Sequence, residues 1–119
     1  MTDSFRFEQL IVYKSAVEFT KDLYSETLGW PKTEQFGLVN QCRRASVSIA
    51  LNIAEGSSRT RKDFQHFISL SRGSCFEVAA CLQIALSLEF LSESDYQKLY
   101  VRTIKIAKML SSLKSSISK

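Results

Sequence analysis

The side chains that could perform catalysis or hold a metal are scarce in this sequence. Its 119 residues contain a single histidine, His66, and three cysteines. Asp63 stands about one helical turn before His66, but no serine or cysteine nucleophile is spaced to work with that pair. The Glu-x-x-His motif of di-iron bundles is absent, and Cys75 and Cys81 are six residues apart, wider than zinc-ligand pairs. We therefore expect a protein that is not an enzyme and that uses no metal or cofactor.

Basic side chains form the other chemically distinctive group. Lysine and arginine number 16 against 12 aspartate and glutamate residues, which gives a formal net charge of +4. Residues 96–119 hold six basic and no acidic residues, so positive charge is concentrated in this part of the sequence. Such asymmetry favours an anionic partner, or an acidic surface on a neighbouring subunit.

Two groups of basic residues are spaced to contact nucleic-acid phosphates. One group recurs along one side of a predicted helix, and the other precedes or opens a helix, where free N–H groups and the helix dipole attract anions. The candidates are Arg59, Arg61, Lys62, Lys98, Arg102, Lys105 and Lys108. For the first group the alternative is a solvated helix face. For the second, Thr60 would already cap the helix, and the arginines would pair with Glu55 or with a neighbouring subunit.

These residues must be positioned by helices, because apolar residues recur every three or four positions and nothing reads as a strand. Four helices are predicted, over residues 7–28, from 33 or 34 to 56, 60–90 and from 92 onward. Gly29 and Pro31 end the first helix, while Thr60 and Ser92 are N-cap residues of the third and fourth. The short connections predict an all-α, up-down-up-down antiparallel four-helix bundle that forms a single domain, residues 1–119.

The composition indicates where such a domain would reside. Hydrophobic residues make up 45% and charged residues 24%, which is ordinary for a globular protein. No run of 18 apolar residues and no signal peptide is visible, and the cysteines lack the spacing of a disulfide framework. We expect a cytoplasmic protein that contacts no membrane and takes no small-molecule substrate.

The core of the bundle is predicted from the apolar stripe of each helix. In the first helix the stripe comprises Leu10, Tyr13, Val17, Thr20, Tyr24 and Thr27. The other stripes run from Leu38 to Ile53, from Phe64 to Ala85 and from Leu99 to Ile117. The second and third helices also carry a second apolar group on another side. It comprises Val47, Ala50, Leu51 and Ala54 on the second helix and Phe76, Ala80 and Ile84 on the third. A helix that is apolar on two sides needs a second partner, so this group is predicted to form an oligomer interface.

A polar row runs along the second helix between its two apolar sides. It comprises Gln41, Arg44, Ser48, Asn52 and Glu55, which follow one another at steps of three or four. Because buried polar groups must be hydrogen-bonded, the row is predicted to be a bonded network that fixes the helix register. Asn52 would bond across to a neighbouring helix, and Glu55 would pair with Arg59 or Arg72. A ligand cleft lined by Asn52 and Glu55 is the alternative.

The run from Gly37 to Arg59 resembles the signature of the 23S rRNA intervening-sequence protein family, and Asn52 to Gly56 is its most specific element. The likeness continues through Lys62 to Phe64 and Gly73 to Glu77. Known members are four-helix bundles that assemble into cyclic pentamers, and some are encoded within insertions of bacterial 23S rRNA genes. A related fold serves as a nucleic-acid-binding accessory protein in retroelements. The resemblance therefore implies this fold and a homopentamer, whereas the family's biochemical function is poorly defined.

Two functional hypotheses follow from these features. The first is a non-enzymatic, oligomeric helical bundle that binds the RNA or DNA backbone through its basic surface. The second is a protein-interaction scaffold or accessory subunit whose charge asymmetry serves assembly, without direct contact to nucleic acid. Steep salt dependence of RNA binding would separate the two, because only phosphate contacts release counterions.

Overall fold

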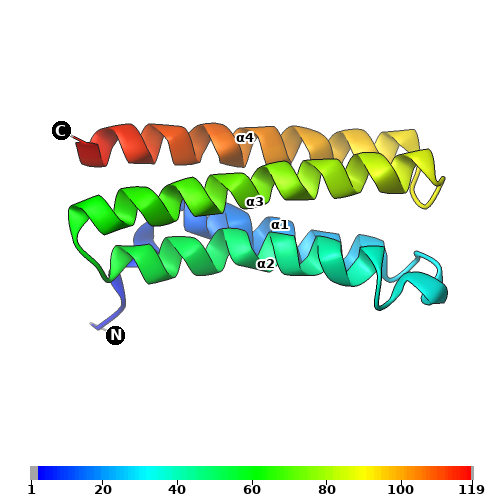
Figure 1. Cartoon of the computed structure of the whole chain (residues 1–119), viewed down its shortest axis with the longest axis horizontal. Coiled ribbons are helices and arrows are strands. Elements are labelled where there is room, and N and C mark those ends of the chain that lie inside the picture. The colour runs from blue at the N-terminus through cyan, green and yellow to red at the C-terminus, as the bar shows by residue number, and fades with distance from the viewer. Residues whose placement is uncertain (1–2, 119) are drawn as a thin grey trace.

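The computed structural model describes residues 3–118, and these form a bundle of four α-helices without a strand (Figure 1). In chain order the elements are the 3₁₀ helix η1 (Arg6–Gln9), α1 (Ile11–Thr27), the 3₁₀ helix η2 (Lys32–Glu34), α2 (Leu38–Ser57), α3 (Arg61–Ser87) and α4 (Glu93–Ser118). Consecutive α-helices run in opposite directions, and both chain ends lie at the same end of the bundle as the α2–α3 turn. The all-α, four-helix prediction is confirmed.

The N-caps of the two longest helices are those predicted. The Thr60 hydroxyl accepts a hydrogen bond from the Asp63 N–H at 3.2 Å, at the start of α3. The Ser92 hydroxyl accepts one from the Asp95 N–H at 3.0 Å, at the start of α4. Each bond satisfies one of the N–H groups that a helix leaves without an internal partner.

Three helix ends differ from the predicted ones. The 3₁₀ helix η1 precedes α1, which begins at Ile11, and η2 delays the start of α2 to Leu38. There the Glu34 carboxylate accepts a hydrogen bond from the Leu38 N–H at 3.1 Å. Helix α3 ends at Ser87, and Glu89 follows in a left-handed conformation with φ of 63°. A left-handed residue at this place is a common way for a chain to leave a helix.

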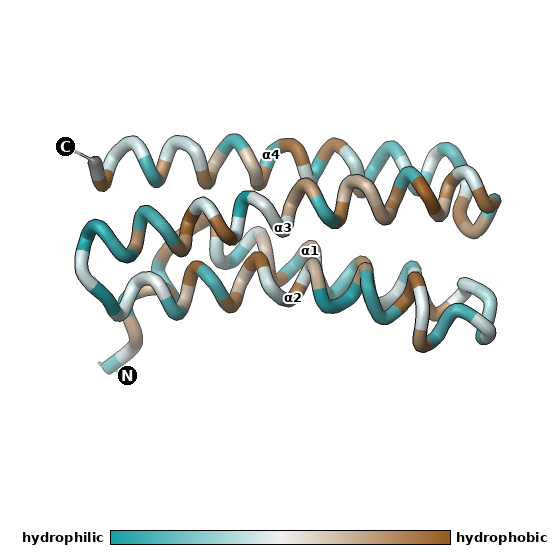
Figure 2. The backbone as a smooth tube through the Cα atoms, in the orientation of Figure 1, coloured by the Kyte–Doolittle hydropathy of each residue, from teal (hydrophilic) through white to brown (hydrophobic). Residues whose placement is uncertain are grey.

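The apolar stripes predicted for α2, α3 and α4 face the core. Ile49, Ile53, Ile68, Leu82 and Leu110 are all fully buried, each with 0% exposure. Hydrophobic and hydrophilic segments alternate along all four helices, as one buried side per helix requires (Figure 2). The predicted stripes of these three helices are therefore confirmed.

The stripe predicted for α1 is wrong at Val17 and Tyr24, whereas Thr27 is buried and Leu10 and Tyr13 pack against the core as predicted. Val17 and Tyr24 are 42% and 40% exposed, whereas Phe19 and Leu23 are fully buried together with Ala16. Both sets of residues recur at steps of three or four, so periodicity alone does not choose between them. Of the buried α1 residues only Thr27 carries a hydroxyl group, which donates to the Leu23 carbonyl. Burying a phenylalanine or leucine side chain gains about 1.5–3 kcal/mol. Helix α1 is therefore rotated to bury the more apolar set.

Candidate nucleic-acid interface

Of the four basic candidates on α4, three are exposed and one, Arg102, contacts residues of α1. Lys98, Lys105 and Lys108 are exposed on the helix surface. Arg102 is half-buried, and its Nη1 lies 2.7 Å from Oδ2 of Asp22 on α1. The Arg102 guanidinium also lies 5.4 Å from the ring centre of Phe19. Arg102 thus links α4 to α1, while the three lysines can present their charge to solvent.

The three lysines have different electrostatic surroundings. Lys98 shares a surface hollow between α1 and α4 with three carboxylate residues, Asp22, Glu26 and Asp95. Lys105 and Lys108 together line another hollow between these helices, and its described lining contains no acidic residue. Lys105 also lines a third hollow, where one carboxylate residue, Glu18, lies with Lys14 and Arg102. Because nearby carboxylates offset a positive potential, an anion is attracted more strongly around Lys105 and Lys108 than around Lys98.

The α2–α3 turn holds the second group of basic candidates. Arg59 donates from Nε and Nη2 to Glu55 Oε2, at 3.1 and 2.8 Å, and its guanidinium lies 5.0 Å from the ring centre of Phe67. The predicted pairing of Glu55 with Arg59, rather than Arg72, is confirmed. Arg61 and Lys62 are exposed in the first turn of α3. An anion at this turn would therefore compete with the Glu55 carboxylate for Arg59.

The second apolar side predicted for α2 and α3 is unburied in the single chain. Leu51, Phe76 and Ile84 are 62%, 60% and 50% exposed, and Ala80 is exposed as well. Val47 and Ala54 differ, because they are half-buried, and the prediction is wrong for Ala50, which is buried in the core of the single chain. Unburied apolar clusters of this kind mark interaction surfaces.

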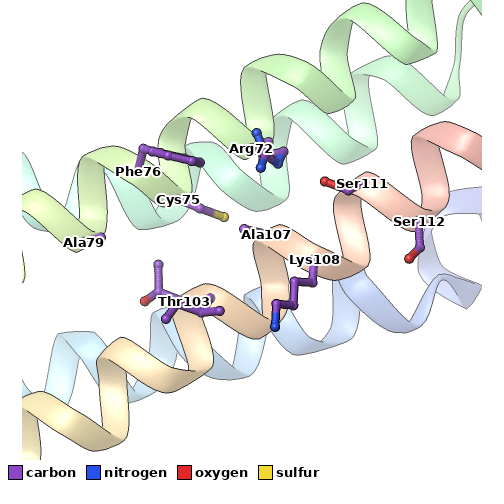
Figure 3. Close-up of a pocket in the computed structure, with 10 residues that line it drawn as sticks. Arg72, Cys75, Phe76, Ala79, Thr103, Ala107, Lys108, Ser111 and Ser112 are labelled. Atoms are coloured by element: carbon purple, nitrogen blue, oxygen red, sulfur yellow. The ribbon is translucent and has the colours of Figure 1, made fainter.

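Sequence reasoning missed that α4 contributes to the same apolar surface. Val101 and Ile104 are 58% and 40% exposed. Ile104 lines a groove of about 470 Å³ between α3 and α4. Phe76 lines the same groove from α3 (Figure 3). A helical wheel places both residues off the core side of α4, but nothing in the sequence tells which neighbouring helix they approach.

The polar row on α2 is divided into separate contacts. The Asn52 amide donates to both the carbonyl and the hydroxyl of Ser48 at 2.9 Å, and the Ser74 hydroxyl donates to the Ser48 hydroxyl at 2.9 Å. Gln41 hydrogen-bonds to Glu77 of α3. The expectation that Asn52 bonds across to another helix is wrong: its amide turns back to Ser48, and Ser48 is reached from α3. Arg44 is exposed, as are Gln41 and Glu55 at the two ends of the row.

We expect Asn52→Ala to lower the free energy of unfolding by about 1 kcal/mol, because two hydrogen bonds of a half-buried amide are lost. Asn40→Ala is the matched control, since Asn40 is an exposed residue of the same helix. Urea denaturation would give both values. An equal effect of the two substitutions would show that the Ser48 contacts contribute nothing to stability.

The cysteine side chains behave as buried apolar groups. A hydrogen bond with Cys81 and burial both raise the pKa of the Cys42 thiol. Burial raises the pKa of the Cys75 thiol to about 12. A thiol must ionise to act as a nucleophile or a metal ligand, and these two stay protonated at neutral pH. Among residues 3–118 no group of three or more His, Cys, Asp or Glu side chains is placed to hold a metal ion.

Comparison with known proteins assigns the chain to a family. The family model described as 23S rRNA-intervening sequence protein matches residues 8–112. The chain belongs to this family. No curated protein is significantly similar to it. Among solved structures, a protein of unknown function from the S23 ribosomal protein family of Bacteroides thetaiotaomicron has 21% identity and a TM-score of 0.79, covering 88% of this chain and 96% of its own. That likeness shows a shared fold.

In this intervening-sequence protein, the element from Asn52 to Gly56 lies where α2 meets the start of α3. Gly56 is buried, and a Cβ atom added to it would lie 2.5 Å from the Cβ of Phe67 and 2.9 Å from Cδ1 of Phe64. Glycine is thus the residue that lets the two helix backbones approach here. Ahead of it, Asn52 and Glu55 make local contacts, so the element serves the α2–α3 junction. In the described part of the chain, no helix is long and apolar enough to cross a membrane.

Proposed function

We propose that this intervening-sequence protein is a non-catalytic, cytoplasmic, self-associating bundle that binds the RNA or DNA backbone through exposed lysines. The observation that carries the proposal is the pair Lys105 and Lys108, which are exposed together beside a hollow whose described lining has no acidic residue. Phosphate contacts by such side chains supply most of the affinity in sequence-independent binding. The family name, which refers to 23S rRNA, supports RNA as the partner.

Self-association would multiply this charge. The exposed Leu51, Phe76 and Ile84 provide the apolar area that subunit contacts require. A homopentamer, which the family resemblance implies, would repeat the Lys105 and Lys108 pair in every subunit. Such repetition raises the local positive potential and the on-rate for a long anionic polymer.

A scaffold that assembles without nucleic acid is the competing function. It is favoured by the internal pairing of two candidate arginines, Arg59 with Glu55 and Arg102 with Asp22. Their positive charge is partly used within the chain, so the remaining exposed lysines must account for any binding. The two functions therefore predict different effects of removing a single lysine on the affinity for nucleic acid.

We expect Lys105→Gln to weaken binding to a labelled duplex RNA and to reduce the slope of log K against log salt concentration by about 0.8, the loss of one phosphate contact. Lys98→Gln removes the same charge from the same helix, but beside Asp22, Glu26 and Asp95. It is expected to leave that slope nearly unchanged. Fluorescence anisotropy over a range of salt concentrations would measure both slopes, and light scattering would show that the mass is unaltered.

The result that would reject nucleic-acid binding is equally direct. If the unmodified protein has no salt-dependent affinity for the RNA, the scaffold function stands in its place. Equal effects of the two substitutions would mean that net charge alone, and not the surface around Lys105, governs the interaction.

A further inference from the structure

The groove between α3 and α4 is an apolar surface that the single chain leaves open. Its volume is about 470 Å³, and Ile104 lines it from α4. Phe76 and Ala79 line it from α3 and Ala107 from α4 (Figure 3). Phe76 and Ile104 are 60% and 40% exposed. Burying these groups would gain about 25 cal/mol for each Å² of apolar surface, so an apolar side chain from outside would be held there.

A projecting apolar side chain is present elsewhere on the same molecule. Leu51 of α2 is 62% exposed, and Val47 and Ala54 lie four and three residues away, on the same side of the helix. Within one chain α2 packs on α1 and α3 but makes no direct contact with α4. Leu51 therefore cannot fill the groove of its own chain, and only a second copy can supply it.

We propose that Leu51 of one copy inserts into the α3–α4 groove of a neighbouring copy. This inference rests on the proposed self-association and names its contact. The contact joins two different patches, so each copy offers a leucine on one side and a groove on the other. Such a contact is head-to-tail, in contrast to a twofold contact in which one patch meets itself.

Charge sets the direction in which the neighbour docks. Two cationic residues, Arg72 and Lys108, line the groove, and its described lining has no acidic residue. Glu55 is exposed one turn after Leu51 on α2, and its side chain is 51% exposed despite the bond to Arg59. With Leu51 beside Phe76, Glu55 comes closest to the cations when the neighbour's α2 runs opposite to α3. Because α2 and α3 are antiparallel in each copy, the α2 helices of the two copies then point the same way.

This orientation has a consequence for the assembly. Copies whose α2 helices are parallel are related by rotation about an axis that runs along the bundle. The α2–α3 turns of all copies, with Arg61 and Lys62, then gather on one side of the assembly. The contact therefore also determines how the basic surface is displayed.

The test is a mixing experiment with two variants, Leu51→Glu and Ile104→Glu, followed by light scattering. Each variant alone is expected to have the mass of one chain, because a buried carboxylate on either patch blocks the contact. Mixed in equal amounts, they are expected to form particles of two chains. Leu51→Glu retains an intact groove, and Ile104→Glu retains an intact Leu51, so one contact is restored. Leu28→Glu and Ile11→Glu are the controls, since these residues are 78% and 72% exposed outside both patches.

Each other outcome rejects either self-association or the proposed Leu51 contact. A parent protein with the mass of one chain rejects self-association itself. A parent that self-associates, with a mixture that stays at the mass of one chain, leaves self-association standing and rejects this contact. Variants that keep the mass of the parent reject it as well.

A second measurement covers the case in which either glutamate variant fails to fold, as circular dichroism would show. A chain with Leu51→Cys is mixed with a chain with Ala107→Cys under oxidising conditions. A disulfide-linked pair is expected from the mixture and not from either chain alone. Both chains also carry Cys75→Ala, because Cys75 lines the groove. Cys42 and Cys81 are buried and do not line it, so they give little background. Absence of the linked pair in a self-associated sample overturns the proposal.

Discussion

Phe19→Ala is expected to lower the free energy of unfolding by about 3–5 kcal/mol, the usual cost of truncating a buried aromatic side chain. Phe19 is 0% exposed, on the face of α1 that also buries Leu23. The Arg102 guanidinium lies over the Phe19 ring, so truncation also removes a contact between α1 and α4. Val17→Ala is expected to cost only about 0.5 kcal/mol, because Val17 is 42% exposed and the substitution removes a smaller side chain from a partly exposed position.

Urea denaturation followed by circular dichroism would measure both values. The comparison is a test of how α1 is rotated, since Val17 and Phe19 are only two residues apart and point to different sides. If Val17→Ala proved the more damaging substitution, α1 would bury the stripe that contains Tyr13, Val17 and Tyr24 instead of the one that contains Phe19.

Helix α1 also shows where sequence reasoning loses its power. In α2, α3 and α4 one stripe is clearly the most apolar, and those helices bury the predicted residues, such as Ile49, Ile68 and Leu110. In α1 two stripes have the same period, and tyrosines and threonines make the wrong one look amphipathic. Only packing against α2 and α4 decides between them. Helix starts are predictable only where a local residue type marks them. Thr60 and Ser92 are typical N-cap residues, whereas no residue type in the sequence predicts the 3₁₀ helices before α1 and α2.

The candidate site was predictable in its residue types but not in its pairings. The sequence indicates that Leu51, Phe76 and Ile84 form surplus apolar surface, and all three are exposed. It cannot show that Arg102 meets Asp22, 80 residues away in sequence, or that Ile104 lies across a groove from Phe76. Such contacts depend on the distance and rotation between helices, which periodicity does not contain.

The two proposed activities use different flanks of α4 and are compatible in one particle. The groove lies between α4 and α3, whereas Lys105 lines hollows on the α1 side. Lys108 borders both, so it is the residue through which assembly and phosphate binding would influence each other. A test of binding is therefore cleaner at Lys105, and a test of assembly is cleaner at Leu51.

Gly56→Ala is expected to lower the free energy of unfolding by about 1–3 kcal/mol, the cost of adding a methyl group where no space exists. An alanine ordinarily stabilises a helix relative to glycine by about 1 kcal/mol, so the expected sign is the reverse of the helix-propensity effect. The reversal comes from Phe67, whose Cβ would lie 2.5 Å from the new methyl group. That atom is attached directly to the α3 backbone, so rotation of the phenyl ring gives no relief and α3 itself must move.

Gly73→Ala provides the matched control for this prediction. Gly73 is an exposed residue within α3, and a Cβ added to it meets nothing within 4 Å. This substitution is expected to raise the free energy of unfolding by about 0.5–1 kcal/mol, as helix propensity alone predicts. Urea denaturation of the two variants would thus give opposite signs for the same chemical change. A gain in stability at Gly56 would show that α2 and α3 do not approach closely there, and the family element from Asn52 to Gly56 would need another explanation.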